Sequence, residues 1–178
     1  RGTFTKHNLD FAKDAVHMAE LGFDQVSVEP VVSDPKLPYS LQEEDLPAAF
    51  AEYENLANIL IDRKKKGKGF NFFHFMIDLN QGPCAIKRLR GCGCGNEYVC
   101  VTPEGDIYPC HQFVGEEKWK MGNIMEDTFD IPMKQEFALT NVYSKEDCKD
   151  CWAKFYCSGG CAANSWQYEG NILKSHKL

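Results

Sequence analysis

The sequence has no apolar run of the roughly 18 residues that a membrane-spanning helix needs. Its first residues contain no apolar segment of the kind that forms a secretory signal peptide. It has no internal repeat and no low-complexity tract. Positively charged residues are outnumbered, with 20 Lys and Arg against 26 Asp and Glu, and the formal net charge of −6 argues against a surface for nucleic acids. We therefore expect a cytoplasmic protein without nucleic-acid or membrane partners.

Hydrophobic residues make up 43% of the chain, which is enough apolar material for a globular core. The chain begins with Arg1 instead of Met, so we expect it to be part of a longer protein. The basic run at residues 63–66 is interpreted as the solvated C-terminal end of a helix, where cations complement the helix dipole.

Cysteine is abundant, with nine residues in the chain of 178. Four of them form the block Cys148-x2-Cys151-x5-Cys157-x3-Cys161, and the others lie upstream at Cys84, Cys92, Cys94, Cys100 and Cys110. Closely spaced pairs would close only small disulfide loops, and the reducing cytoplasm disfavours disulfides. The density of cysteine therefore predicts metal or redox chemistry.

Thiolates bind both iron–sulfur clusters and zinc. Zinc sites commonly take their four ligands from two knuckles, and Cys148-x2-Cys151 alone resembles a knuckle. The wider steps that follow favour a larger iron–sulfur cluster, whose irons take ligands from separated turns. Gly159-Gly160 permits a tight bend with backbone N–H groups free to donate to sulfur. Iron–sulfur binding is the favoured interpretation, and zinc is the alternative.

The first part of the sequence has an α/β pattern. We predict a strand at residues 1–5, a helix over residues 9–20 capped by Asn8, and a strand at residues 25–29. Strand, helix and strand form one crossover unit of a parallel sheet. The predicted buried stripe of this helix comprises Leu9, Ala12, Val16 and Ala19.

A second helix is predicted over residues 45–66, after a capping box formed by Ser40 and Glu43. Its first turn can contain Pro47, which lacks the N–H that a first turn leaves unpaired. Its predicted buried stripe comprises Phe50, Tyr53, Ala57 and Leu60. The aromatic segment at residues 70–79 is predicted to be a buried strand.

The amino-acid composition changes at about Gly82, after which glycine and cysteine become frequent. Residues 97–102 and 107–110 flank a Gly-containing turn, which predicts a β-hairpin. A short helix is predicted at residues 131–139. We therefore predict two domains, at residues 1–81 and 82–178.

The motifs resemble a known family. Cys92-x12-Gly105-x4-Cys110, the four-cysteine block and the segment VTPEGDIYPCHQF resemble the SPASM domain of radical S-adenosylmethionine (SAM) enzymes. Upstream, RGTFTKHNLDF and GFDQVSVEPVV resemble the late strands of the partial (β/α)6 barrel of those enzymes. The subgroup that the chain resembles is the maturase of the six-cysteine SCIFF peptide, a ranthipeptide maturase that forms thioethers.

The resemblance implies a fold and a set of cofactors. The fold would be α/β, with the last strands and helices of the barrel followed by a small Cys-rich SPASM domain that contains a β-hairpin and short helices. The SPASM domain would bind two auxiliary 4Fe–4S clusters. The ligands of the first would include Cys92, Cys110 and Cys161, and Cys94 could take its fourth position.

The resemblance implies that the second cluster is bound by Cys148, Cys151 and Cys157. In the family, a further cysteine downstream completes this cluster. The sequence ends at Leu178 without that cysteine. Either the SPASM domain is truncated at its C-terminus, which is the favoured interpretation, or three thiolates bind the cluster.

The family cleaves SAM with a cluster bound by Cys-x3-Cys-x2-Cys, and the sequence does not contain this spacing. We therefore expect residues 1–178 to be enzymatically inactive by themselves. Arg1 and Glu29 follow the pattern of strand ends where such barrels contact SAM or substrate, and a buried salt bridge is the alternative for both.

The resemblance implies an enzyme that installs thioether crosslinks in a Cys-rich ribosomal precursor peptide. The intact enzyme would use SAM, a third 4Fe–4S cluster and an electron donor such as a flavodoxin or ferredoxin. Two other functions stay open, namely a structural zinc module that recruits a partner protein and a cluster-bearing electron-transfer protein. The roles of Cys84 and Cys100, the peptide, the crosslinked residue and the oligomeric state are also open.

A few other residues have weaker functional interpretations. His74 is interpreted as a hydrogen-bonded core histidine, and His111 either donates to a cluster sulfide or lies on the surface. The aromatic residues near the cysteine block are expected to shield a cluster from water or simply to pack, namely Trp152, Phe155, Tyr156 and Trp166.

Overall fold

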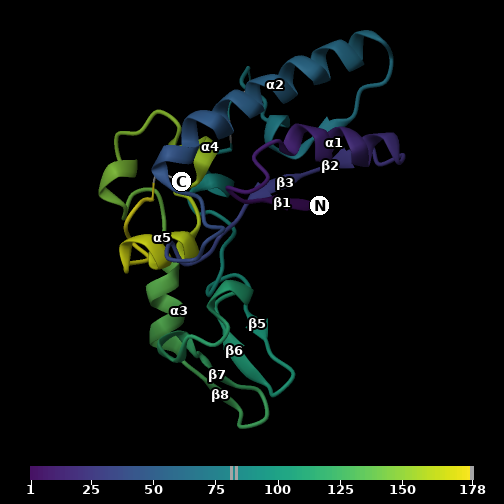
Figure 1. The fold of residues 1–178 in the computed structure, drawn as a ribbon. Coiled ribbons are helices and arrows are strands. Elements are labelled where there is room, and N and C mark those ends of the chain that lie inside the picture. The colour runs from purple at the N-terminus through teal and green to yellow at the C-terminus, as the bar shows by residue number, and fades with distance from the viewer. Residues whose placement is uncertain (81, 83, 177–178) are drawn as a thin grey trace. The chain divides into compact units, whose positions relative to one another are not determined.

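The computed structural model describes residues 1–80, 82 and 84–176, and these form the mixed α/β structure that the sequence predicts. They divide into two compact units, one ending at Asn80 and one ending at His176 (Figure 1). The boundary residue Gln81 and residues 177–178 of the predicted domains lie outside the described residues.

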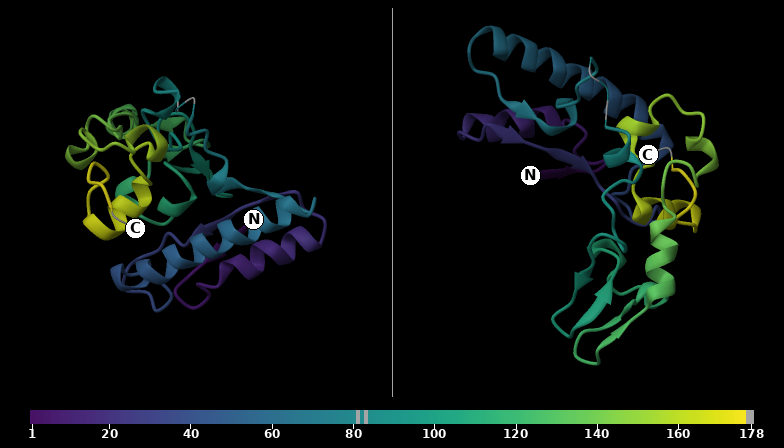
Figure 2. Two further views of the ribbon diagram at one scale, coloured as in Figure 1. Left: turned by 90° about the horizontal axis from the view of Figure 1, so that it is seen from above. Right: turned by 180° about the vertical axis from the view of Figure 1, so that it is seen from behind.

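The first unit alternates short strands with helices. Its elements are β1 (Gly2–Phe4), α1 (Phe11–Glu20), β2 (Gln25–Val26), β3 (Val28–Pro30), α2 (Leu46–Lys65) and β4 (Asn71–Phe72). β1 pairs in parallel with β3, and β2 pairs in parallel with β4. The intervening helices supply the crossovers that parallel pairing requires, as predicted. Figure 2 shows α1 and α2 side by side, and they pack against each other over one apolar core.

The predicted cap of the first helix is wrong, whereas its predicted stripe is confirmed at Ala12, and Leu9, Val16 and Ala19 lie partly buried. The Asn8 carboxamide oxygen accepts from the Thr5 backbone N–H at 2.8 Å and from the Thr5 hydroxyl at 2.7 Å, so Asn8 closes the turn after β1. Asp10 is the N-cap residue of α1. Since α1 begins at Phe11, the side chains that it buries are Phe11, Ala12 and Ala15.

The capping box predicted for the second helix is also displaced. The Ser40 hydroxyl instead donates to the Asp34 carbonyl oxygen at 2.5 Å and lies 2.8 Å from the Ser33 hydroxyl. Gln42 and Asp45 form the box, around the 3-10 turn that precedes α2. The Ser40 position is buried within the preceding loop, so its side chain serves that loop.

The predicted apolar face of the second helix is shifted. Ala49 and Leu56 are the buried residues of α2, while Phe50 is 60% exposed. Tyr53, Ala57 and Leu60 lie partly buried. Apolar residues occur on several sides of this helix, so the pattern alone does not decide which side faces the core.

The segment at residues 70–79 is not a long buried strand. β4 comprises Asn71–Phe72, and Phe73–Phe75 then turn as a 3-10 helix. Phe72 is buried, whereas Met76 and Leu79 are exposed. An apolar run therefore predicted burial where the chain leaves the sheet after two residues.

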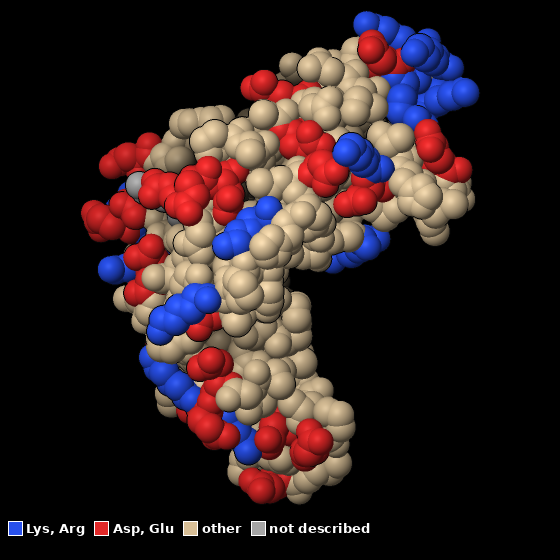
Figure 3. All heavy atoms as spheres, in the orientation of Figure 1, with Lys and Arg blue, Asp and Glu red and all other residues tan. Residues whose placement is uncertain are grey.

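The basic run lies at the C-terminal end of α2, as predicted. Arg63, Lys64 and Lys65 occupy its last turn, and Figure 3 shows the cations gathered at this end of the helix. Arg63 pairs with Glu20 at 3.3 Å. The positive ends of these side chains complement the unpaired carbonyl groups there.

The second unit consists of a small sheet and short helices. Its elements are β5 (Cys100–Val101), β6 (Asp106–Tyr108), β7 (Gly122–Asn123), β8 (Thr128–Phe129), α3 (Ile131–Ala138), α4 (Lys154–Cys157) and α5 (Ala162–Glu169). The strand order is β5-β6-β7-β8, and neighbouring strands are antiparallel. The first hairpin and α3 correspond to the predicted hairpin and short helix.

Further turns of the chain are 3-10 helices. They lie at Glu43–Asp45, Phe73–Phe75, Ile86–Arg88, His111–Phe113, Glu117–Trp119 and Glu146–Cys148.

An aromatic cluster forms the core of the second unit. The rings of Phe113, Trp119 and Phe137 meet edge to face, with centroids 5.2–5.6 Å apart, and Trp166 lies 5.1 Å from Trp119. Phe137 also covers Gly95, where an added Cβ would lie 2.5 Å from the ring. The core therefore holds the glycine-rich loop that carries Cys94.

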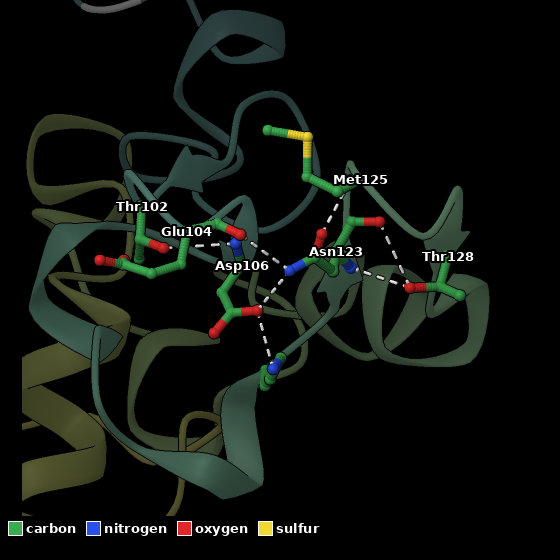
Figure 4. Close-up of polar contacts among 7 residues, drawn as sticks. Thr102, Glu104, Asp106, Asn123, Met125 and Thr128 are labelled. Carbon is green, nitrogen blue, oxygen red and sulfur yellow. Dashed lines mark hydrogen bonds and ion pairs between the residues drawn. The ribbon is translucent and has the colours of Figure 1, made fainter.

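Asn123 joins the two hairpins of the sheet through its side chain (Figure 4). Its Nδ2 donates to Asp106 Oδ1 at 2.7 Å and to the Glu104 carbonyl oxygen at 3.1 Å. Its Oδ1 accepts from the Met125 N–H at 2.7 Å, and its own N–H donates to the Thr128 hydroxyl at 2.9 Å. The side chain is thus satisfied as both donor and acceptor within a buried residue.

We expect Asn123→Ala to lower the free energy of unfolding by about 2–3 kcal/mol, because it leaves several partly buried polar groups without partners. Urea unfolding followed by circular dichroism measures this loss. Glu126→Ala is the control, since Glu126 is exposed in the same hairpin. Equal losses in the two variants would show that the Asn123 side chain does not hold the hairpins together.

Candidate iron–sulfur centre

Cys92, Cys94 and Cys110 come together and form the first cysteine group. The Cys94 thiol interacts with the thiols of both Cys92 and Cys110. The backbone explains this interaction, because the Gly95 N–H donates to the Pro109 carbonyl oxygen at 3.0 Å. That bond ties the loop of Cys92 and Cys94 to the residue before Cys110.

In the first cysteine group, the shifts in pKa favour the thiolate form of Cys92 and Cys110. A hydrogen bond with Cys94 lowers the pKa of Cys92 to about 5, against the effect of burial, and the Tyr98 hydroxyl adds a bond at 3.3 Å. A hydrogen bond with Cys94 likewise lowers the pKa of Cys110 to about 7. The pKa of Cys94 itself is raised, first by its hydrogen bonds with Cys110 and Cys92. Thiolate is the form that binds metals.

Cys161 lies beside this group. It interacts electrostatically with Cys92 and Cys110 and precedes the first turn of α5. Burial raises the pKa of Cys161, while hydrogen bonds from the N–H groups of Asn164 and Ala163 oppose that increase. These N–H groups are donors that a bound thiolate sulfur can use.

Two glycines let the loops of Cys92 and Cys161 approach each other. A Cβ added to Gly91 would lie 2.8 Å from the Gly160 carbonyl oxygen, so a larger residue would push the loops apart. A small cavity lies between them, and its lining comprises Gly91, Cys92, Gly93, Cys94, Thr140, Lys145, Gly160 and Ala162.

Cys148, Cys151 and Cys157 form the second cysteine group. Successive turns bring them together: the Cys151 N–H donates to the Cys148 carbonyl oxygen at 3.3 Å, and Cys157 ends α4. Cys148 interacts electrostatically with both other members. Burial raises the pKa of Cys148, and the neighbouring Lys145 ammonium opposes that increase.

The residues around both groups fit an anionic sulfur centre. Lys145 is 2% exposed, and its ammonium lies near thiols of both groups. Burial lowers its pKa, and electrostatic interaction with the cysteines at positions 148, 161, 157 and 94 opposes this decrease. The Ser158 hydroxyl is buried in the turn between Cys157 and Cys161 without a hydrogen-bond partner in the described part of the chain. An unpaired donor and a buried cation both suit thiolate and sulfide.

Neither Lys145 nor Ser158 was among the residues that the sequence suggested. Lysine is most often exposed, so no pattern marks a buried one. Ser158 has a left-handed backbone with φ of 61°, next to Gly159 and Gly160, and this run of tight turn residues was the available signal.

Cys84 and Cys100 are not brought into either group. Cys84 is exposed, and Cys100 lies half-buried in β5 opposite Tyr108. His111 is exposed. Trp152 is 85% exposed and shields little, which contradicts its predicted role.

The first unit contains a separate polar network. His74 Nε2 lies 2.6 Å from Glu29 Oε2, and His74 Nδ1 lies 2.8 Å from the Tyr53 hydroxyl. Both ring nitrogens are thus hydrogen-bonded, as predicted, although His74 is partly exposed. Burial and the charge of Glu29 raise the pKa of Tyr53 to about 12. Arg1 is exposed.

Within residues 1–80, 82 and 84–176, no three histidine, cysteine or acidic side chains already surround one point as the ligands of a single metal ion do. In the same residues, no helix combines the length and the apolar character that crossing a membrane requires.

Residues 92–152 match the family model of the SPASM iron–sulfur cluster-binding domain. This SPASM segment includes Cys92, Cys94 and Cys110, together with Cys148 and Cys151. The predicted SPASM resemblance is therefore confirmed for this part of the chain.

Relatives with known sequences or structures cover more than the SPASM segment. An uncharacterized protein of Archaeoglobus fulgidus is 27% identical over 88 residues, which are 48% of this chain and 21% of that protein. The solved structure of polyhistidine-tagged anSMEcpe with bound AdoMet has a TM-score of 0.69 and 21% identity, over 97% of this chain and 47% of that one.

A second structure, native anSMEcpe with AdoMet and the Kp18Cys peptide, has a TM-score of 0.59 and 22% identity, over 90% of this chain and 46% of that one. The chain thus spans about half the length of the structures it matches. At this identity the likeness shows that the two chains share a fold and shows nothing beyond that.

Proposed function

We propose that the chain is the C-terminal part of a radical SAM peptide maturase that installs thioether crosslinks in a Cys-rich ribosomal peptide. The observation that carries this proposal is the gathering of Cys92, Cys94 and Cys110 within a segment that matches an iron–sulfur domain. Similarity to anSMEcpe, which has been solved with AdoMet and a peptide, supports the radical SAM chemistry and the peptide substrate.

The second unit would hold two auxiliary 4Fe–4S clusters. Cys92, Cys94, Cys110 and Cys161 would bind the first, and Cys148, Cys151 and Cys157 the second. When bound, such clusters accept or donate single electrons and can take a thiolate ligand. The residues of this chain would orient the clusters, donate hydrogen bonds to sulfur and keep water from part of each cluster.

The first unit would contribute strands and side chains near SAM or the peptide. Glu29 is the proposed contact there, with His74 fixing the direction of its carboxylate. Arg1 is the second proposed contact and is free to reach a carboxylate because it is exposed. An electron donor such as a ferredoxin or flavodoxin would reduce the clusters.

Anaerobic purification tests the cofactor assignment. We expect iron and acid-labile sulfide in equal amounts and a brown chromophore, because both cysteine groups favour a sulfur centre. Zinc without colour would contradict the proposal and support the structural zinc module.

Incubation of the intact protein, of which these residues are proposed to be the C-terminal part, with SAM, a reductant and a Cys-rich peptide tests the reaction. Each thioether removes a pair of hydrogen atoms from the peptide and blocks one thiol against alkylation, and mass spectrometry detects both changes. An iron–sulfur protein that leaves all peptide thiols alkylatable would be an electron carrier instead of a maturase.

A further inference from the structure

Lys145 is a buried lysine that the sequence pattern does not explain. It is 2% exposed. It lies between Val142 and Cys148, in the turn that leads into the cysteine block. Its Nζ donates to the Gly159 carbonyl oxygen at 2.8 Å and to the Ser165 hydroxyl at 3.2 Å. These bonds fix the ammonium between the Cys157–Cys161 turn and α5.

A buried ammonium requires a negative partner, because removing it from water is costly. No carboxylate forms an ion pair with Lys145 in the described part of the chain. The groups that interact with it electrostatically are the thiols of Cys148, Cys161, Cys157 and Cys94, which would be negatively charged as ligands of a bound cluster. Lys145 also lines the small cavity that Cys92 and Cys94 line.

A second lysine in the same block shows the contrast. Lys149 lies between Cys148 and Cys151, but its side chain is 45% exposed and pairs with Glu146 at 2.6 Å. Solvent screens an exposed charge of this kind, and its carboxylate partner neutralises it. Lys145 is buried, and among the described residues it has no carboxylate partner.

We propose that Lys145 is the counter-charge shared by both cysteine groups and that it raises the reduction potentials of the clusters bound there. The inference rests on the proposed function. Reduction adds one negative charge to a cluster, and a fixed ammonium nearby stabilises the reduced form more than the oxidised form. Lys145 thus places a fixed positive charge near both cysteine groups, and this one charge interacts with the first group and with the second.

The test compares Lys145→Gln, Lys145→Arg and Lys149→Gln with the unaltered protein, all purified without oxygen. Iron and sulfide content is measured first, and cluster potentials are then measured by redox titration with electron paramagnetic resonance. We expect Lys145→Gln to make reduction at least tenfold less favourable for one or both clusters, a shift of about 59 mV for a one-electron couple. Lys145→Arg and Lys149→Gln should each change the cluster potentials by less than about 59 mV.

Each outcome decides the proposal. An Lys145→Gln variant that keeps its iron and its potentials would overturn it, and so would loss of iron from both Lys145 variants. Loss of iron from Lys145→Gln alone, with Lys145→Arg intact, would support a requirement for the charge. If the unaltered protein holds no iron–sulfur cluster, the proposed function fails, whereas unchanged potentials in a loaded protein contradict the role of Lys145 alone.

Discussion

Replacing Cys148, Cys151 and Cys157 together by alanine is expected to remove one 4Fe–4S cluster, or about 4 iron atoms per chain, and to leave the other cluster in place. The reason is structural separation. The second cysteine group is built by its own turns and α4, while the first depends on Gly95 and the end of β6. Iron and sulfide analysis, with the electron paramagnetic resonance spectrum of the reduced protein, measures the loss.

Cys84→Ala is the matched control for the triple variant, because Cys84 is exposed and lies outside both groups. We expect it to keep all of its iron. Unchanged iron in the triple variant would show that these cysteines are not ligands. Loss of all iron would show that the two groups hold a single centre.

Gly122→Ala is expected to lower the free energy of unfolding by about 3–5 kcal/mol, the sum of backbone strain and steric overlap. Gly122 has a φ of 135°, and a Cβ there would lie 2.2 Å from the Thr128 carbonyl oxygen. That oxygen belongs to the neighbouring strand β8, so it cannot move without breaking the pairing. Urea unfolding followed by circular dichroism gives the value.

Gly115→Ala separates the two causes in this prediction. Gly115 has a φ of 90° but no atom within 4 Å of an added Cβ, so its alanine variant carries strain without overlap. We expect a loss of about 1–2 kcal/mol there. If Gly122→Ala costs no more than Gly115→Ala, the close approach of β7 and β8 does not limit the fold.

The Gly122 variant also connects stability to the site. β7 pairs with β6, and β6 ends two residues before Cys110. We therefore expect Gly122→Ala to reduce iron content as well as stability.

Local sequence determined much of the outline. The crossover of β1, α1 and β3, the first hairpin and α3 depend on helix and turn signals within a few residues, and they appear where the sequence predicts them. The SPASM motif is equally local, because its cysteine and glycine spacings are read directly along the chain.

Several features depended on surroundings that the sequence does not display. Asn8 and Ser40 were expected to cap helices, yet each is used by its own loop, because more than one backbone group was within reach of a short polar side chain. Phe50 belonged to an apolar stripe and is exposed, since the other elements of the unit decide which side of α2 faces the core.

The cysteine spacing by itself predicted metal or redox chemistry and indicated the SPASM domain. Only the tertiary structure decided that Cys92, Cys94 and Cys110 interact, because a backbone hydrogen bond between Gly95 and Pro109 ties their two segments together. It also decided that Lys145 is buried among thiols. Both features depend on residues far apart in the sequence. A local sequence pattern does not reveal contacts that form only when the chain folds.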